Sequence, residues 1–270
     1  MTPAERWRSE LEAWRIPDEL LAGVDESPYG WPQRFWKRRS AVAADAPEPH
    51  TTKVVRSLVG AAGSVLDVGA GRGRASLPLA VAGCRVTAVE PDPGMAAGLA
   101  EEAAALGVAV EVVPLPWPEA AETVEPADVV MSAHVVYDVW DIVPFLEAMI
   151  DRAGVGVALE LSDRHPWAGL APYYRILHGL DRPSGPTADL LAEVVAALIG
   201  RSPNVDRWTR QGGLYFESMD ELREVFGRRL VLPRDRWTEL DAVLDLTEVD
   251  GRLYVGDEQR ELVTIWWRVP

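Results

Sequence analysis

The chain has 270 residues, of which 48% are hydrophobic, so it can bury the core of one large domain or of a core domain with an appendage. Its formal net charge of −15 repels polyanions, which disfavours nucleic acid and anionic membranes as partners. The charged N-terminus and the lack of a long apolar run predict a cytoplasmic protein without a signal peptide or membrane span. Cys84 is the single cysteine, which excludes an internal disulfide and a cysteine-based zinc site.

Residues 1–50 predict a helical cap in front of the main domain. Trp7, Leu11 and Trp14 fall on one face of a first helix. An aromatic segment follows, in which Tyr29 and Trp31 either line a substrate pocket or dock on the core. The basic run at 34–39 is interpreted as a solvated helix face rather than as a nucleic-acid patch.

A first strand over residues 64–68 runs into a glycine-rich turn. Gly69 and Gly71 lack the Cβ atoms that would keep the backbone from a ligand, and Gly73 lets the next helix pack on the sheet. Asp67 lies two residues before the turn. The dinucleotide fingerprint needs glycines at the first, third and sixth places, and the sequence does not provide them. The pattern therefore predicts a site for a nucleotide-like cofactor other than a dinucleotide.

The next two elements continue this predicted site. A helix is expected over residues 74–82, with a bend at Pro78 because proline removes a backbone hydrogen bond. The second strand, 85–90, ends in Glu90, whose carboxylate can accept both hydroxyls of a ribose. In the helix after this strand, Met95 either reaches over the adenosine or fills the core.

The third and fourth strands lead to further candidate residues. After the third strand, 108–113, a proline-rich loop carries Trp117, which either stacks on an adenine ring or packs on the sheet edge. The fourth strand, 128–133, leads to His134 and Tyr137. In α/β sheets ligands bind beyond the carboxyl ends of the strands, so these two residues are expected near the reacting centre.

The remainder of the chain completes the predicted sheet. A fifth strand, 155–161, leads to His165, and residues 163–186 are interpreted as a lid insertion rich in glycine, proline and aromatic residues. A sixth strand is expected at 205–210 and a last, antiparallel one at 262–269. Helices are expected at 187–200, 219–229 and 237–247. The predicted fold is a seven-stranded, mostly parallel, doubly wound α/β sheet over residues 51–270.

Three motifs resemble those of the class I, Rossmann-like methyltransferases that use S-adenosylmethionine: residues 65–73, 89–91 and 128–139. The segments 14–17, 27–32, 134–137 and 177–183 are similar to a group of bacterial methyltransferases from high-GC organisms. The resemblance implies the fold and S-adenosylmethionine as cofactor, but no substrate. Arg72 and Arg74 depart from the small residues that are frequent in this loop, and they can narrow the methionine end of the site.

The candidate site residues fall into three groups. The cofactor group comprises Asp67, Gly69, Ala70, Gly71, Glu90, Pro91, Met95, Trp117 and Ala133. The catalytic group comprises His134, His165 and Tyr137, and the substrate group comprises Tyr29, Trp31, Tyr173 and His178. No metal site is expected.

Methyl transfer is an in-line displacement that depends mainly on the positioning of donor and acceptor, although an oxygen or nitrogen acceptor also needs a base. His134 or His165 is expected to be that base, with Tyr137 placing the acceptor. The acidic chain favours a small, neutral or cationic organic acceptor. A protein that binds S-adenosylmethionine without turnover stays an alternative, and a nicotinamide oxidoreductase is disfavoured by the glycine spacing. The oligomeric state stays open, with a homodimer as one option.

Overall fold

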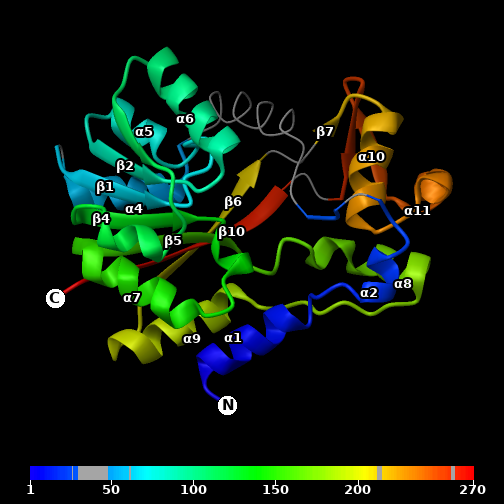
Figure 1. The fold of residues 1–270 in the computed structure, drawn as a ribbon, viewed down its shortest axis with the longest axis horizontal. Helices are drawn as coiled ribbons and strands as arrows, with labels where there is room; N and C mark the ends of the chain where they lie inside the picture. Colours follow the sequence, from blue (N-terminus) through cyan, green and yellow to red (C-terminus); the bar gives the residue numbers. More distant parts are fainter. Residues whose placement is uncertain (26, 30–47, 61, 212–214, 257–258) are drawn as a thin grey trace.

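The computed structural model describes residues 1–25, 27–29, 48–60, 62–211, 215–256 and 259–270. Its centre is a seven-stranded sheet in the order β3-β2-β1-β4-β5-β10-β6 (Figure 1). β10 runs antiparallel to both of its neighbours, and β1 to β5 are parallel. The strands are β1 (Ser64–Val68), β2 (Arg85–Val89), β3 (Val110–Val113), β4 (Ala127–Ala133), β5 (Ala153–Ser162), β6 (Asn204–Gln211) and β10 (Gln259–Arg268). The predicted seven-stranded α/β sheet and its antiparallel last strand are confirmed.

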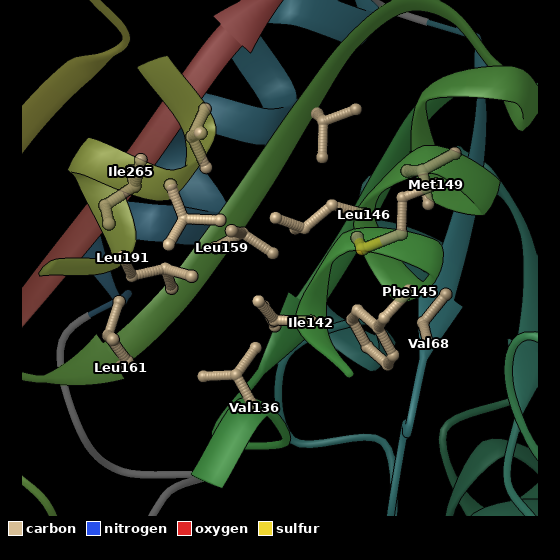
Figure 2. Close-up of a cluster of buried hydrophobic side chains, with 14 of the residues drawn as sticks. Val68, Val136, Ile142, Phe145, Leu146, Met149, Leu159, Leu161, Leu191 and Ile265 are labelled. Atoms are coloured by element: carbon tan, nitrogen blue, oxygen red, sulfur yellow. The ribbon is translucent and has the colours of Figure 1, made fainter. Parts of the chain in front are cut away.

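Helices cover both faces of this sheet. One face is covered by α4 (His50–Val59) and α5 (Leu77–Val81), and α6 (Pro93–Ala105) packs beside β3. The other face is covered by α1 (Pro3–Glu12), α7 (Ile142–Arg152) and α9 (Ala188–Ile199). Figure 2 shows Ile142, Phe145, Leu146 and Met149 of α7 among strand residues of this second face. The central strands are apolar on both faces because helices bury both.

The predicted bend at Pro78 is wrong. α5 begins only at Leu77, so Pro78 lies in its first turn. A backbone N–H has no helical partner at that position, and proline therefore costs no hydrogen bond there. Residues 74–76 form turns between the glycine loop and the helix.

A second core lies beside the main sheet, at the right of Figure 1. It is built around a three-stranded antiparallel sheet in the order β7-β9-β8. Its elements are α2 (Asp18–Leu21), α8 (Ala171–His178), β7 (Tyr215–Phe216), α10 (Met219–Arg229), α11 (Leu240–Val243), β8 (Leu246–Val249) and β9 (Arg252–Val255). Tyr174 of α8 is fully buried there, and its hydroxyl donates to the carbonyl of Arg229 at 2.7 Å. The predicted lid segment thus packs on a core formed mainly by the last third of the chain.

The predicted helix over 237–247 is confirmed only as far as Val243, and its last part is wrong. A 3-10 helix (Arg234–Glu239) and α11 are followed by the hairpin of β8 and β9. Asp250 and Gly251 have φ of +51° and +72° at its turn, as two-residue hairpin turns require.

The N-terminal helix is fixed on the second face of the sheet. Thr2 and Glu5 form a capping box at its start. Trp7 is fully buried, and its indole N–H donates to the carbonyl of Val139 at 2.9 Å. Within the described residues no helix is both long and apolar enough to cross a membrane.

Candidate functional site

The glycine loop after β1 has the backbone conformation that its sequence requires. Gly69 and Gly71 have φ of +71° and +57°, in the left-handed region that side chains disfavour. The N–H of Gly69 donates to the carbonyl of Val89 at 2.8 Å, which ties the loop to the end of β2. A Cβ at Gly69 would collide with Val135, whereas a Cβ at Gly71 would meet no atom within 4 Å. The loop therefore presents open backbone at Gly71.

Glu90 is held against this loop. One carboxylate oxygen accepts the N–H of Gly71 at 2.7 Å, and the other accepts the N–H of Asp92 at 2.9 Å. The residue is 8% exposed. Each carboxylate oxygen can accept more than one hydrogen bond, so Glu90 is oriented by the backbone and can still accept from a ligand.

Asp67 is a buried carboxylate below the same loop. Within the described residues, neither of its oxygens has a hydrogen-bond partner. Burial raises its pKa to about 6, partly opposed by the nearby Ser76 hydroxyl, which does not reach hydrogen-bond geometry, and by the Arg74 charge. Buried polar groups are almost always hydrogen-bonded, so this carboxylate indicates that a ligand supplies the donor.

A polar cluster connects the ends of β4 and β5. Glu160 of β5 is buried and binds Arg74 at 2.5 Å and the Nε2 of His134 at 3.2 Å. Burial alone would raise the pKa of Glu160, but Arg74 and His134 outweigh it and hold the pKa well below its usual range. Glu160 was not among the residues predicted from the sequence, where the available signal was one charged residue in an otherwise apolar central strand.

The hydrogen bonds of this cluster assign the tautomer of His134. The backbone N–H of Ser162 donates to the hydroxyl oxygen of Tyr137, which leaves the Tyr137 hydroxyl proton to donate to Nδ1 of His134, 3.4 Å away. Nε2 then carries the proton that faces Glu160. Burial raises the pKa of Tyr137 to about 12, so its hydroxyl keeps its proton at neutral pH. His134 itself has φ of +62°, uncommon for a residue other than glycine.

His165 lies close to this cluster in a more apolar setting. Its ring stacks on Trp14 with centroids 4.3 Å apart and meets the edge of Tyr137 at 5.7 Å. Its Nδ1 accepts the N–H of Trp167 at 3.2 Å. Burial, aided by the charge of Arg182, lowers its pKa to about 4. The imidazole is therefore neutral at pH 7.

The predicted substrate residues Tyr29, Tyr173 and His178 all contact residues of the second core. Tyr29 stacks on Trp167 with centroids 5.6 Å apart, close to His165, and Trp31 lies outside the described residues. In α8, the Tyr173 hydroxyl accepts the N–H of Asp245 at 3.4 Å, and Nε2 of His178 lies 2.6 Å from the carbonyl oxygen of Leu230. The structure does not bring Tyr173 and His178 together with His134, so their substrate role stays a prediction.

The remaining predicted cofactor residues lie in the glycine loop or at or after the carboxyl ends of β2, β3 and β4. The N–H of Met95 is capped by the carboxylate of Asp92 at 2.8 Å, at the start of α6. The indole N–H of Trp117 donates to the carbonyl of Phe145 at 3.1 Å, and its ring packs on the main core. Ala70 is in the loop, Pro91 follows Glu90, and Ala133 is the last residue of β4.

The two loop arginines point to different elements. Arg72 lies against Gly98 and binds Glu102 of α6 at 2.8 Å, so it does not narrow the methionine end of the site. Arg74 reaches Glu160 at the other side of the loop.

Residues 65–153 match the family described as a methyltransferase domain. The matched stretch begins in β1, contains the glycine loop, Glu90 and His134, and ends at the first residue of β5. It supports a class I methyltransferase and indicates S-adenosylmethionine as the cofactor. No curated protein sequence matches the chain.

Solved structures resemble the chain over most of its length. A putative methyltransferase from Bacillus halodurans C-125 has 15% identity over 82% of this chain and 99% of its own, with a TM-score of 0.50. A structure described as the conversion of a disulfide bond into a thioacetal group during echinomycin biosynthesis has 18% identity over 93% of this chain and 91% of its own, with a TM-score of 0.52. Magnesium protoporphyrin IX methyltransferase from Synechocystis PCC 6803, with S-adenosylhomocysteine bound, has 13% identity over 95% of this chain and 94% of its own, with a TM-score of 0.49. At such identities the first two show the fold alone, a Rossmann-like methyltransferase fold.

The residues of the loop fit S-adenosylmethionine. This cofactor carries a positive sulfonium, an ammonium group and two ribose hydroxyls. Asp67 offers a buried carboxylate without a partner among the described residues, and Glu90 offers a carboxylate fixed by backbone donors. Gly71 leaves the backbone accessible between them.

Proposed function

We propose that the chain transfers the methyl group of S-adenosylmethionine to an oxygen or nitrogen atom of a small organic molecule. The observation that carries the proposal is the buried carboxylate of Asp67 below a glycine loop that is open at Gly71. When bound, the cofactor supplies a methyl group on a positively charged sulfur.

The carboxylates at the ends of β1 and β2 would hold the cofactor. Glu90 would accept the ribose hydroxyls, since its orientation is already set by the amides of Gly71 and Asp92. Asp67 would accept from the ammonium group and gain the donor that the described protein does not provide. Binding a cation there also offsets the cost of burying this carboxylate in its charged form.

His134 is the base that the geometry favours. Glu160 fixes the Nε2–H of His134, so Nδ1 is the nitrogen that can take a proton from the acceptor. Arg74 keeps Glu160 ionised and aligned. Because the Tyr137 hydroxyl already donates to Nδ1, the proton would move by a relay in which Tyr137 gives its own proton to Nδ1 and takes the proton of the acceptor, which Tyr137 would also position.

His165 would contribute mainly to the shape of the acceptor region. Its lowered pKa of about 4 makes it a weak base, and Trp14 covers one face of its ring. Together with Tyr29 and Trp167 it forms an aromatic group beyond the end of β5. Such a group favours a small acceptor over a nucleic acid.

A tritium-transfer assay tests the proposal. Purified protein is incubated with methyl-tritiated S-adenosylmethionine and a panel of small phenols, amines and carboxylic acids, with total RNA as a separate arm. We expect transfer to a small molecule that His134→Ala reduces about 100-fold or more. Preferred transfer to RNA would reject the substrate class, and cofactor binding without transfer to any arm would favour the sensor alternative.

A further inference from the structure

Two arginines lie opposite each other at the edge of the sheet where β4 and β5 end. Arg210 of β6 and Arg260 of β10 are partners in the antiparallel ladder between these strands. Two residues further along β10, Leu262 pairs with Ser162, the last residue of β5. Because β10 is antiparallel to β5, its beginning lies at this carboxyl edge, and β6 ends there as well.

Strand alternation places both arginines on the face of the sheet that carries Glu160. Thr264 lies four residues after Arg260, therefore on the same face, and it pairs with Glu160. The indole N–H of Trp208, two residues before Arg210, donates to the hydroxyl of Thr264 at 3.0 Å. Arg74 reaches Glu160 on this face too.

The arginines are close enough to influence each other. Burial, then the positive charge of Arg74, lowers the pKa of Arg210, and the charge of Arg260 adds to this effect. Burial also lowers the pKa of Arg260, partly opposed by the nearby Tyr137, although the residue as a whole is exposed. Among these groups Glu160 is the carboxylate that opposes the shift of Arg210, and it already binds Arg74 and His134.

No hydrogen bond or ion pair holds the guanidinium of Arg210 or Arg260 within the ranges that the structure describes. Glu160, the carboxylate whose charge acts on Arg210, is paired with Arg74 and His134 instead. In a chain with a net charge of −15, two such cations at one edge of the sheet are an exception to the overall field.

We infer that Arg210 and Arg260 bind an anionic group, a carboxylate or a phosphate, of the methyl acceptor. This inference rests on the proposed methyl transfer and specifies its substrate class. Guanidinium groups bind both oxyanions in a forked geometry, and a pair of them suits a group with two or more oxygens. This inference specifies a small acid, in contrast to the neutral or cationic acceptor expected from the net charge.

The site is then polarised along the edge of the sheet. Asp67 and Glu90 lie at the ends of β1 and β2, on the side of the cationic donor. Arg210 and Arg260 lie at β6 and β10, beyond β4 and β5 in the strand order. His134 follows β4, between the two sides. A cationic donor and an anionic acceptor would therefore each meet opposite charges.

The test follows the side-chain Nε–H signals of the arginines by nitrogen-15 NMR in the full chain, loaded with S-adenosylhomocysteine. Arg210→Gln and Arg260→Gln assign the two signals by their loss. Benzoate and inorganic phosphate are titrated separately as probes. We expect saturable shifts of both signals with at least one probe, and binding about tenfold or more weaker in either variant. The probe that binds more tightly shows whether the two arginines prefer a carboxylate or a phosphate.

Arg268→Gln is the matched control, since Arg268 is exposed on the same face of β10 at its opposite end, and it should leave anion binding unchanged. Calorimetry of each sample with S-adenosylhomocysteine shows separately whether the cofactor site binds its ligand, which tests the proposed function. The anion titration is also repeated without S-adenosylhomocysteine, so that anion binding is still measured if this ligand does not bind. If Arg210→Gln does not fold, anion binding is compared between the wild type and Arg260→Gln, since Arg260 is exposed. Unsaturable shifts with both probes, or equal binding by the folded glutamine variants, would overturn the inference.

Discussion

Replacing Asp67 with asparagine tests the buried carboxylate below the glycine loop. Asp67 is 1% exposed, and burial raises its pKa from 3.8 to about 6. The folded state therefore holds the proton more tightly than the unfolded chain does. Asparagine has nearly the same shape and no charge, so it avoids the cost of a buried anion.

The size of the effect follows from the linkage between protonation and folding. Because the pKa of Asp67 is raised in the folded state, its contribution to stability is fully present below the unfolded pKa and is lost as the pH rises through about 6. A shift of about two pH units corresponds to about 3 kcal/mol. We expect Asp67→Asn to exceed the wild type in unfolding free energy by up to about 3 kcal/mol at about pH 7.5, and by much less at about pH 4.

Urea unfolding at both pH values, followed by circular dichroism, measures this difference. The same variant should bind S-adenosylhomocysteine about tenfold or more weakly, because it loses a charged acceptor. Asp128→Asn is a control of opposite sign. Asp128 accepts the N–H and the hydroxyl of Ser64 at 2.7 Å and 2.9 Å, which lower its pKa, so its substitution should reduce stability. An Asp67→Asn protein less stable than the wild type at about pH 7.5 would refute the reasoning.

Three further predictions concern the polar residues of the site. Glu90→Ala should weaken binding of S-adenosylhomocysteine about 10- to 100-fold in calorimetry, with an unchanged circular dichroism spectrum, and unchanged affinity would contradict its role. Glu160→Gln should lower the unfolding free energy by roughly 3 kcal/mol, because it removes a buried carboxylate and leaves the partly buried cation of Arg74 without its counter-ion; a loss below about 1 kcal/mol in urea would count against a tight pair. His134→Ala should lower kcat about 100-fold while cofactor affinity is kept, whereas His165→Ala should change kcat less, and the reverse order would transfer the base role to His165.

The main sheet was predictable because its signals are local. Each of the parallel strands β1 to β5 is a short, largely apolar run followed by a glycine, a proline or a polar residue, and the parallel order follows from the alternation of strands and helices. Glu90 could be placed from sequence because it ends such a strand. The same kind of signal located His134 and His165 at the ends of β4 and β5.

The parts of the fold and of the candidate site that were not predicted depend mainly on contacts between residues that are far apart in the sequence. Arg74 and Glu160 are separated by 86 positions, and no local pattern predicts that they pair. His134 and His165 look equivalent in the sequence, but a carboxylate orients one ring and a tryptophan covers the other. The hairpin of β8 and β9 was missed because its residues are largely exposed, so burial does not produce a clear alternation of apolar and polar residues.

Titration calorimetry with S-adenosylhomocysteine and with NAD tests the central claim most directly. The loop of Gly69, Gly71 and Gly73, together with the carboxylates of Asp67 and Glu90, predicts micromolar binding of S-adenosylhomocysteine and far weaker binding of NAD. Binding of NAD that is as tight as or tighter than that of S-adenosylhomocysteine would contradict the account.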